Sequence, residues 1–450
     1  MAKYKAYPEY KDSEVEWFDV RPLSWKVTRL KLETFMNMGQ SPSSDDCNIE
    51  GDGLAFLQGN AEFGKVNPIE KQYCPVAKKI ANPGDILFSV RAPVGAMNFA
   101  DKKYGIGRGL CSISASEKVT SPFLWWLLPT YKYQLDAIAT GSTFEAVSAE
   151  QLGNLCFALP SISEQSQIAA FLDHETAKID NLIEKQQQLI ELLKEKRQAV
   201  ISHAVTKGLN PDVPMKDSGV EWLGEVPEHW SICRIKQLSK QISKGTTPST
   251  IGGDFVDAGI RFLKAENIGK SKFVNSLPEF YISNDVDKQI SRSRLQERDV
   301  LVIIAGATTG MVSVLQKEML PANTNQAVSF IRTKNINHAD WLYYWLGTDI
   351  VQRIIGMGAV QAAQPNLSME DLGNIPILLP EQNELASICM EIEKQFVHFD
   401  SLICKAESAI DLMQERRTAL ISAAVTGKID VRDWVAPALN DAEVPQVATA

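Results

Sequence analysis

The chain has 450 residues, with 46 lysines and arginines against 55 aspartates and glutamates, and a formal net charge of −9. Its 44% apolar and 22% charged residues are ordinary for a soluble globular protein with two or three domains. The longest uncharged run, Val300–Leu315, is too short to span a bilayer, and the N-terminus lacks the apolar core of a signal peptide. We therefore expect a cytoplasmic protein.

The seven cysteines, at positions 47, 74, 111, 156, 233, 389 and 404, are widely scattered. They form no C-x-x-C motif, and the five histidines do not cluster with them. This pattern predicts reduced thiols and no zinc site.

The first part of the chain, residues 1–158, predicts a mixed α/β domain. Leu54–Leu57 and Ile86–Val90 are short apolar runs between turn-forming residues, which is typical of strands, whereas Phe123–Tyr133 has a helical pattern. Residues 21–158 carry 14 basic and 13 acidic residues, so this part is nearly neutral despite the acidic whole. A basic face for nucleic acid therefore remains possible here.

Residues 159–206 predict one long helix. Ser161 followed by Glu164 fits a capping box, and Gly208 is a plausible stop. The apolar residues form a heptad-like seam that favours a partner helix over simple packing on one domain. The predicted seam is Ile168, Leu172, Ile179, Leu182, Leu189, Leu193 and Val200. About 40 helical residues would span about 60 Å.

The second part of the chain repeats this plan. A predicted linker, residues 207–224, precedes a second mixed α/β domain, residues 225–378, with 16 basic and 15 acidic residues. A second helix is predicted over residues 379–430, with Gly427 as its stop and with a flexible tail over 431–450. The domain's predicted elements are strands Ile260–Leu263 and Val300–Ile304 and helix Ala339–Tyr344, and the second seam is Ile388, Ile392, Phe399, Leu402, Ala409, Met413 and Leu420.

The two parts are an internal duplication. Residues 159–206 and 379–426 share 18 identities in 48 positions without a gap. Lys11–Trp17 returns as Lys216–Trp222, at an offset of 205 instead of 220. The ends and the helices of the two parts match closely, whereas their central segments diverge. This pattern predicts one scaffold that carries two different binding surfaces.

No catalytic motif is present in the sequence. There is no G-x-x-x-x-G-K-[ST] for ATP, and the glycine-rich Gly105–Gly109 has no strand–helix unit around it. Asn67-Pro68-Ile69-Glu70 lacks the second proline and the aromatic residue of an adenine methyltransferase motif. We therefore expect a non-enzymatic protein.

Polar residues recur in the turns of both halves. Arginine, lysine, asparagine and glutamine can read base edges through paired hydrogen bonds, and serine and threonine reach phosphates or bases. Singly, each is more often an ordinary turn residue, but their recurrence favours a shared DNA-binding surface. The candidates are Gln40, Ser41, Gln58, Asn60, Arg91, Arg108, Ser142 and Thr143 in the first half, and Thr246, Thr247, Lys264, Asn267, Asn325, Gln326 and Gln364 in the second.

In its repeated layout and in several short sequence motifs, the chain resembles the specificity (S) subunit of type I restriction–modification enzymes. The resemblance covers residues 1–430 and is clearest in the alternation of variable and conserved parts. The phrases that carry it are Tyr7–Ser13, Phe56–Asn60, Val90–Gly95, Gly107–Leu110, Pro214–Gly224, Pro227–Trp230 and the two Ile-Ser-x-Ala-Val-Thr helix ends.

The resemblance implies an α+β fold of two target recognition domains, joined by two long helices in an antiparallel coiled coil with a pseudo-two-fold repeat. Each domain would read one half of a split double-stranded DNA target. Positions 40, 58, 60, 91, 108 and 143 follow from family phrases, and 246, 264, 326 and 364 from the internal alignment. Two modification (M) subunits with S-adenosylmethionine, and restriction (R) subunits with ATP and Mg, would be the partners, and no cofactor is expected in this chain.

Two other functions remain open from the sequence alone. One is an enzyme, a methyltransferase or a nuclease, with an unfamiliar site. The other is a scaffold that clamps protein partners with its helix pair and does not bind DNA.

Overall fold

The structure is a computed structural model, which describes residues 4–15, 18–132, 134–136, 146–269, 271–359 and 366–436. The chain divides into two compact units. Unit 1 comprises Met1–Gln186 with Ser408–Ala450, and unit 2 comprises Gln187–Glu407. The boundary between them falls inside both long helices.

Unit 1 contains two four-stranded sheets, in the orders β6-β5-β10-β7 and β4-β11-β8-β9, and two strand pairs, β1-β2 and β12-β3. The pairing of β10 with β5 is parallel. The strands are β1 (Tyr10–Val15), β2 (Phe18–Pro22), β3 (Lys26–Arg29), β4 (Thr34–Met38), β5 (Leu54–Leu57), β6 (Tyr73–Cys74), β7 (Ile80–Ala81), β8 (Ile86–Ser89), β9 (Met97–Phe99), β10 (Tyr104–Ile106), β11 (Leu110–Ala115) and β12 (Cys156–Leu159).

The core of unit 1 lies between the sheet of β8 and β11 and the helices packed on it. All four residues of β8 are buried, as its continuous apolar sequence predicts. Helix α2 (Ser121–Leu127) begins where the Thr120 side chain accepts a hydrogen bond from the Phe123 amide, and it buries Phe123 and Leu124. The other short helices are α1 (Leu30–Glu33) and α4 (Ala149–Gly153), with 3-10 turns η1 (Ser44–Asp46), η2 (Asn60–Glu62) and η3 (Leu128–Tyr131).

Unit 2 repeats the order of one four-stranded sheet of unit 1 in full and that of the other in part. Its sheets are β16-β23-β20-β21 and β17-β19-β18-β22, and its strand pairs are β13-β14 and β15-β24. The strands are β13 (Met215–Asp217), β14 (Glu225–Pro227), β15 (Ser231–Arg234), β16 (Ser239–Lys244), β17 (Phe255–Val256), β18 (Ile260–Leu263), β19 (Tyr281–Ile282), β20 (Val300–Ile303), β21 (Val312–Val314), β22 (Ala322–Thr324), β23 (Val328–Thr333) and β24 (Pro376–Leu379).

The units differ where the sequences diverge. The second sheet of unit 1 adds β7 beside β10, whereas that of unit 2 adds β17 beside β19. Unit 2 also has α7 (Asn284–Gln289) between β19 and β20. Its other helices are α6 (Ile235–Leu238), α8 (His338–Leu346), α9 (Asp349–Ala359) and α10 (Met369–Asn374), with 3-10 turns η4 (Pro248–Ile251), η5 (Ala265–Asn267), η6 (Ser291–Ser293) and η7 (Lys317–Met319).

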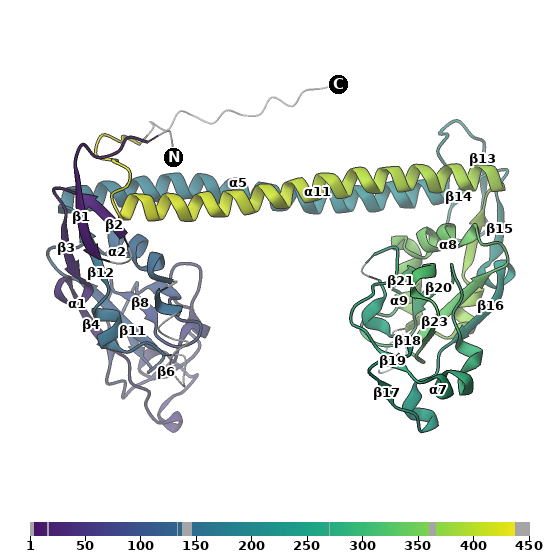
Figure 1. Cartoon of the computed structure of the whole chain (residues 1–450), viewed down its shortest axis with the longest axis horizontal. Helices are drawn as coiled ribbons and strands as arrows, with labels where there is room; N and C mark the ends of the chain where they lie inside the picture. The colour runs from purple at the N-terminus through teal and green to yellow at the C-terminus, as the bar shows by residue number, and fades with distance from the viewer. Residues whose placement is uncertain are drawn as a thin grey trace. The chain divides into compact units, whose positions relative to one another are not determined.

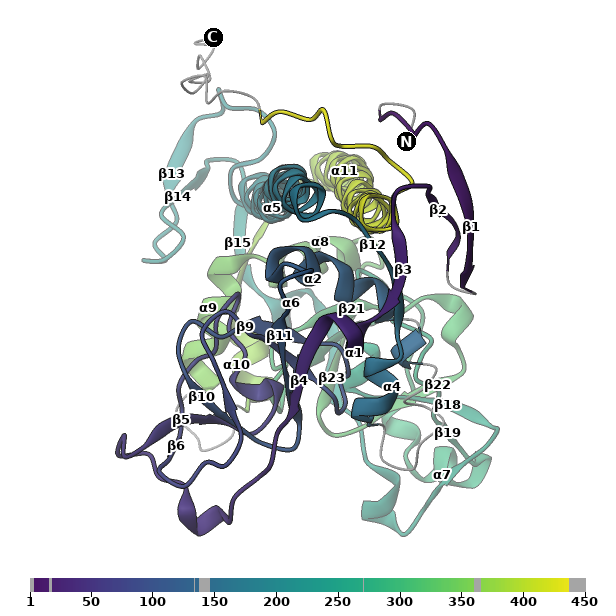
Figure 2. The same ribbon diagram turned by 90° about the vertical axis from the view of Figure 1, so that its left-hand side faces the viewer.

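The two long helices, α5 (Ile162–Lys207) and α11 (Gln382–Val425), run antiparallel within each unit (Figure 1 and Figure 2). In unit 1 the first part of α5 packs on the last part of α11, and Arg417 Nε donates to Asp180 Oδ1 at 2.8 Å. In unit 2 the last part of α5 packs on the first part of α11, and the Arg197 guanidinium lies 5.0 Å from the Phe396 ring centroid. The predicted long helices and their coiled coil are confirmed.

The predicted seam of α5 is wrong at two positions. Leu182 and Leu189 are 48% and 43% exposed, whereas Ile190 is buried and Ile183 is half-buried. The seam continues from Ile179 in steps of four and three residues, so Ile183 and Ile190 of α5 face the partner helix. The leucines flank the seam and face solvent.

Both predicted helix stops are confirmed. Gly208 and Gly427 have φ values of 79° and 74°, the left-handed conformation that glycine adopts at a helix end. The capping box at the start of α5 is half formed. The Glu164 amide donates to Ser161 Oγ at 3.4 Å, while the Glu164 carboxylate accepts the Tyr7 hydroxyl at 2.7 Å.

Two connecting segments contain more structure than the sequence predicted. The predicted linker, residues 207–224, includes β13, which pairs with β14 as β1 pairs with β2 in unit 1. The start of the predicted tail packs on unit 1, since the Trp434 ring contacts Phe171 with centroids 5.5 Å apart. Residues 437–450 lie outside the described residues. No described helix has the length and apolar character needed to cross a membrane.

Candidate functional site

Several turns of unit 1 meet at one edge of its sheets. The turn after β4 carries Gln40, whose amide donates to the Ile106 carbonyl at 2.9 Å. The turn between β10 and β11 begins at Gly107, whose amide donates to the Leu57 carbonyl of β5 at 2.8 Å. Because β5 and β10 run parallel, their carboxyl ends open on the same edge. We call these turns, with the one after β8, turn cluster 1 (residues 39–41, 58–60, 90–91 and 107–109).

Glycines make this convergence possible. A Cβ atom on Gly39 would lie 2.1 Å from the Gly107 carbonyl oxygen, and one on Gly109 would lie 2.8 Å from the Gln58 carbonyl oxygen. Only residues without a side chain allow such close backbone contact. The glycines therefore bring the neighbouring polar residues together.

The predicted residues Gln40, Gln58 and Arg108 are exposed and lie together in turn cluster 1. Gln58 Nε2 donates to Ser41 Oγ at 2.8 Å, and the Arg108 amide donates to the same hydroxyl at 3.3 Å. Ser41 thus links the three turns through the side chain of Gln58 and the backbone of Arg108.

The other predicted residues of the first half are spread around this core. Arg91 is exposed and follows Val90, whose amide donates to the Gly109 carbonyl at 3.0 Å. Asn60 is half-buried at the start of η2. Ser142 and Thr143 lie outside the described residues.

Unit 2 builds the same edge with the same backbone hydrogen bonds. The Thr246 amide donates to the Thr324 carbonyl at 3.0 Å, and the Ile304 amide donates to the Ala327 carbonyl at 2.8 Å. A Cβ atom on Gly245 would lie 1.9 Å from the Thr324 carbonyl oxygen, as on Gly39 in unit 1. We call these turns turn cluster 2 (residues 245–247, 264–267, 304–305 and 325–327).

The side chains of turn cluster 2 differ from those of turn cluster 1. Gln326 is exposed, and Thr246 and Thr247 are half-buried. Lys264 Nζ lies 3.4 Å from the Phe280 ring centroid, so its cation rests on an aromatic ring instead of an acid. The half-buried Asn325 has a buried Oδ1 with no partner among the described residues.

Asn267 does not present its side chain to a ligand. It is buried, its Oδ1 accepts the Lys264 amide at 3.0 Å, and its Nδ2 donates to the Pro278 carbonyl at 2.9 Å. Its role is to shape the turn that carries Lys264. Gln364 lies outside the described residues.

The two clusters offer side-chain donors and acceptors from glutamine, arginine, lysine and threonine on a hydrogen-bonded backbone frame. Such groups make paired hydrogen bonds to base edges and contacts to phosphates. Among the residues that the structure describes, no group of three or more histidines, cysteines, aspartates or glutamates could hold a metal ion.

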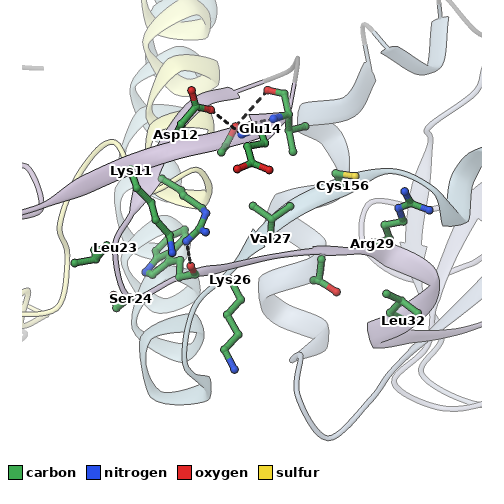
Figure 3. Close-up of a pocket in the computed structure, with 15 residues that line it drawn as sticks. Lys11, Asp12, Glu14, Leu23, Ser24, Lys26, Val27, Arg29, Leu32 and Cys156 are labelled. Atoms are coloured by element: carbon green, nitrogen blue, oxygen red, sulfur yellow. Dashed lines mark hydrogen bonds between the residues drawn. The ribbon is translucent and has the colours of Figure 1, made fainter.

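Sequence reasoning missed a groove elsewhere in unit 1. Its volume is about 740 Å³, and it lies between β1 and β3. Lys11, Asp12 and Glu14 of β1 line one side, opposite Lys26 and Val27 of β3 (Figure 3). The groove includes no residue of turn cluster 1. The repeated Lys-Asp-Ser motif indicates this hairpin in the sequence, but it does not predict the distance between β1 and β3.

Comparison with known proteins shows that segments in both halves of the chain match the same protein family. The family model described as "Type I restriction modification DNA specificity domain" matches residues 37–192 and 227–400. The EcoBI specificity subunit of Escherichia coli is 25% identical over 90% of this chain and 86% of its own length. The putative MjaX specificity subunit of Methanocaldococcus jannaschii is 40% identical, over 39% of this chain and 42% of its own.

Two solved structures share the fold. A chain from a study of assembly and conformational transition of the type I R-M system has a TM-score of 0.71 and 16% identity, covering 91% of this chain and 99% of its own. The HsdS subunit from Thermoanaerobacter tengcongensis has a TM-score of 0.52 and 16% identity, covering 91% and 98%.

Proposed function

The chain belongs to the type I restriction–modification DNA specificity family, and we propose that its two turn clusters each read one half of a split DNA target. As a specificity subunit it recognises DNA and is not the catalytic subunit of the system. One observation supports the assignment of the two clusters. The same backbone hydrogen bonds recur at Gln40 and Thr246, and at Val90 and Ile304, beneath different side chains.

The difference between the side chains is what two-part recognition requires. Turn cluster 1 presents Gln58 and Arg108, whereas turn cluster 2 presents Lys264 and Gln326. Arginine pairs best with guanine and glutamine with adenine, so different sets select different bases. A shared frame with different contacts therefore favours two unlike half-sites over a palindrome.

We propose that the exposed face of α11 in unit 2 binds a modification subunit. Met390 and Val397 are 73% and 66% exposed, and no described residue of unit 2 covers them. They are seven residues apart, so they lie on one face, opposite the seam that Phe399 marks. Large apolar residues at this spacing are typical anchors for another helix.

The catalytic chemistry belongs to the partners under this proposal. Modification subunits would bring S-adenosylmethionine, and restriction subunits would bring ATP and Mg. Basic modification subunits would also offset the net charge of −9, which by itself disfavours binding to DNA.

Arg108→Ala tests turn cluster 1. We expect the complex with the modification subunit to bind target DNA about 10–100-fold more weakly, because a base contact of this kind is worth about 1–3 kcal/mol. Discrimination should relax at one half-site only. Competition binding with DNA altered in either half measures both effects.

Arg29→Ala is the matched control, since Arg29 is exposed in the same unit outside the cluster. It removes the same charge and should leave discrimination intact. Equal effects of the two variants would refute a reading role for Arg108. Undiminished binding by Arg108→Ala, or no sequence preference at all, would favour the scaffold function.

A further inference from the structure

Cys47 and Cys74 of unit 1 stand opposite each other across two extended segments. Asn48 and Tyr73 form an isolated antiparallel bridge and exchange both backbone hydrogen bonds, at 2.9 and 2.8 Å. Cys47 and Cys74 occupy the next position beyond this bridge, where a non-hydrogen-bonded pair falls in an antiparallel arrangement, and their thiols are close enough to hydrogen-bond. The Cα atoms of such pairs are about 4.5 Å apart, within the roughly 4.4–6.8 Å that a disulfide spans.

The side chains of the two residues point to the same side. In an antiparallel pair, directly opposed residues share one face, so the two thiols face each other. The pKa of the Cys47 thiol is raised by burial, and also by the neighbouring Cys74 thiol and Asp46. Cys74 is fully buried and Cys47 is half-buried, so an oxidant reaches Cys47 first.

We propose that Cys47 and Cys74 form an intramolecular disulfide when the chain is exposed to a peroxide. The Cys47 thiolate attacks one peroxide oxygen, the O–O bond breaks, and the other oxygen leaves as water after protonation. The Cys74 thiolate then attacks the Cys47 sulfenic acid, the S–O bond breaks, and a second water leaves. The two thiols lose two electrons, and the peroxide gains them.

The cross-link would join a segment that follows one turn of turn cluster 1 to a strand beside β5, which leads into another. Cys47 lies in the segment between Ser41 and β5, and Cys74 lies in β6, which pairs with β5. Strand β5 leads directly into Gln58. A disulfide would therefore tie the segment that follows Ser41 to the sheet that positions Gln58. This consequence for recognition rests on the proposed function, whereas the disulfide itself does not.

The raised pKa sets the pH dependence of the reaction. Only the thiolate attacks peroxide, and the pKa of Cys47 lies above its usual value of 9.0. The thiolate fraction, and with it the rate, should therefore still be increasing at pH 9.

The test treats the full chain with hydrogen peroxide at pH 9 and maps disulfides by mass spectrometry of a non-reduced digest. We expect one dominant linkage, between the peptides of Cys47 and Cys74, and amide exchange at least about tenfold slower in residues 42–53 than in the reduced chain. Cys47→Ser should abolish the linkage and the slowing, whereas Cys156→Ser should keep both.

Two results would overturn the proposal. One is oxidation of other thiols while Cys47 and Cys74 stay unlinked in the folded chain. The other is a dominant linkage of Cys47 to another cysteine or to a second chain. Because Cys47 is half-buried, Cys47→Ser is expected to fold, and far-ultraviolet circular dichroism checks this. Since no DNA is used, failure here leaves the DNA-reading proposal untouched.

Discussion

Arg332→Met is expected to destabilise unit 2 by about 3–5 kcal/mol, because it leaves a buried carboxylate without its partner. Asp299 is 1% exposed, and Arg332 holds it with two hydrogen bonds, from Nε at 2.9 Å and from Nη2 at 2.7 Å. The arginine also donates to Gln241 Oε1 at 3.1 Å, on β16, so it joins two strands. Calorimetry of the full chain should show the transition of unit 2 lowered by on the order of 10 °C.

The loss of stability caused by Arg332→Met should be smaller at low pH. Burial raises the pKa of Asp299 even beside Arg332, and loss of the arginine raises it further. A carboxyl group whose pKa is higher in the folded than in the unfolded chain stabilises the folded state when it is protonated. The stability of the variant should therefore fall as the pH rises through the folded-state pKa of Asp299, and should recover at lower pH. A loss of stability that is equal at pH 4 and pH 8 would refute the explanation.

The control variant Arg353→Met, at an exposed arginine of α9, should change the stability by less than about 0.5 kcal/mol.

Met390→Glu combined with Val397→Glu is expected to weaken assembly with the modification subunit by at least about 30-fold, since an anchor in an interface contributes about 2 kcal/mol or more. Both side chains are exposed on α11, so the chain itself should fold normally. Titration of the modification subunit in an ultracentrifuge measures the dissociation constant, and circular dichroism checks the fold.

The conservative pair Met390→Leu and Val397→Ile is the matched control for assembly. It keeps the apolar face and should leave the dissociation constant within about threefold of the original. If the glutamate variant assembles as well as the original chain, the modification subunit binds elsewhere.

The sequence predicts local elements well where glycine and proline bound them. The predicted strands Leu54–Leu57 and Ile260–Leu263 are confirmed, and both long helices end at their predicted glycines. The seam was harder to read, because leucines at 182 and 189 stand beside isoleucines at 183 and 190, and a half-buried Gln186 interrupts the apolar pattern. Pattern alone cannot choose between adjacent apolar residues.

The candidate site depends on contacts between distant residues. The sequence identified the polar turns, but their convergence follows from the parallel pairing of β5 with β10, in which Phe56 pairs with Gly105, far away along the chain. The buried role of Asn267 depends on the Pro278 carbonyl in another loop. The opposition of Cys47 and Cys74 likewise follows from strand register. Which residues touch DNA stays a prediction.

Two-part DNA recognition by this chain is tested by mapping methylated adenines in the genome. Genomic DNA from source cells with and without this gene, with the partner genes intact and expressed, would be sequenced for modified bases. We expect one split motif, with two unlike halves, to lose its methylation when the gene is removed. An unchanged methylation pattern, or the loss of a motif that is continuous, would contradict two-part reading by this chain.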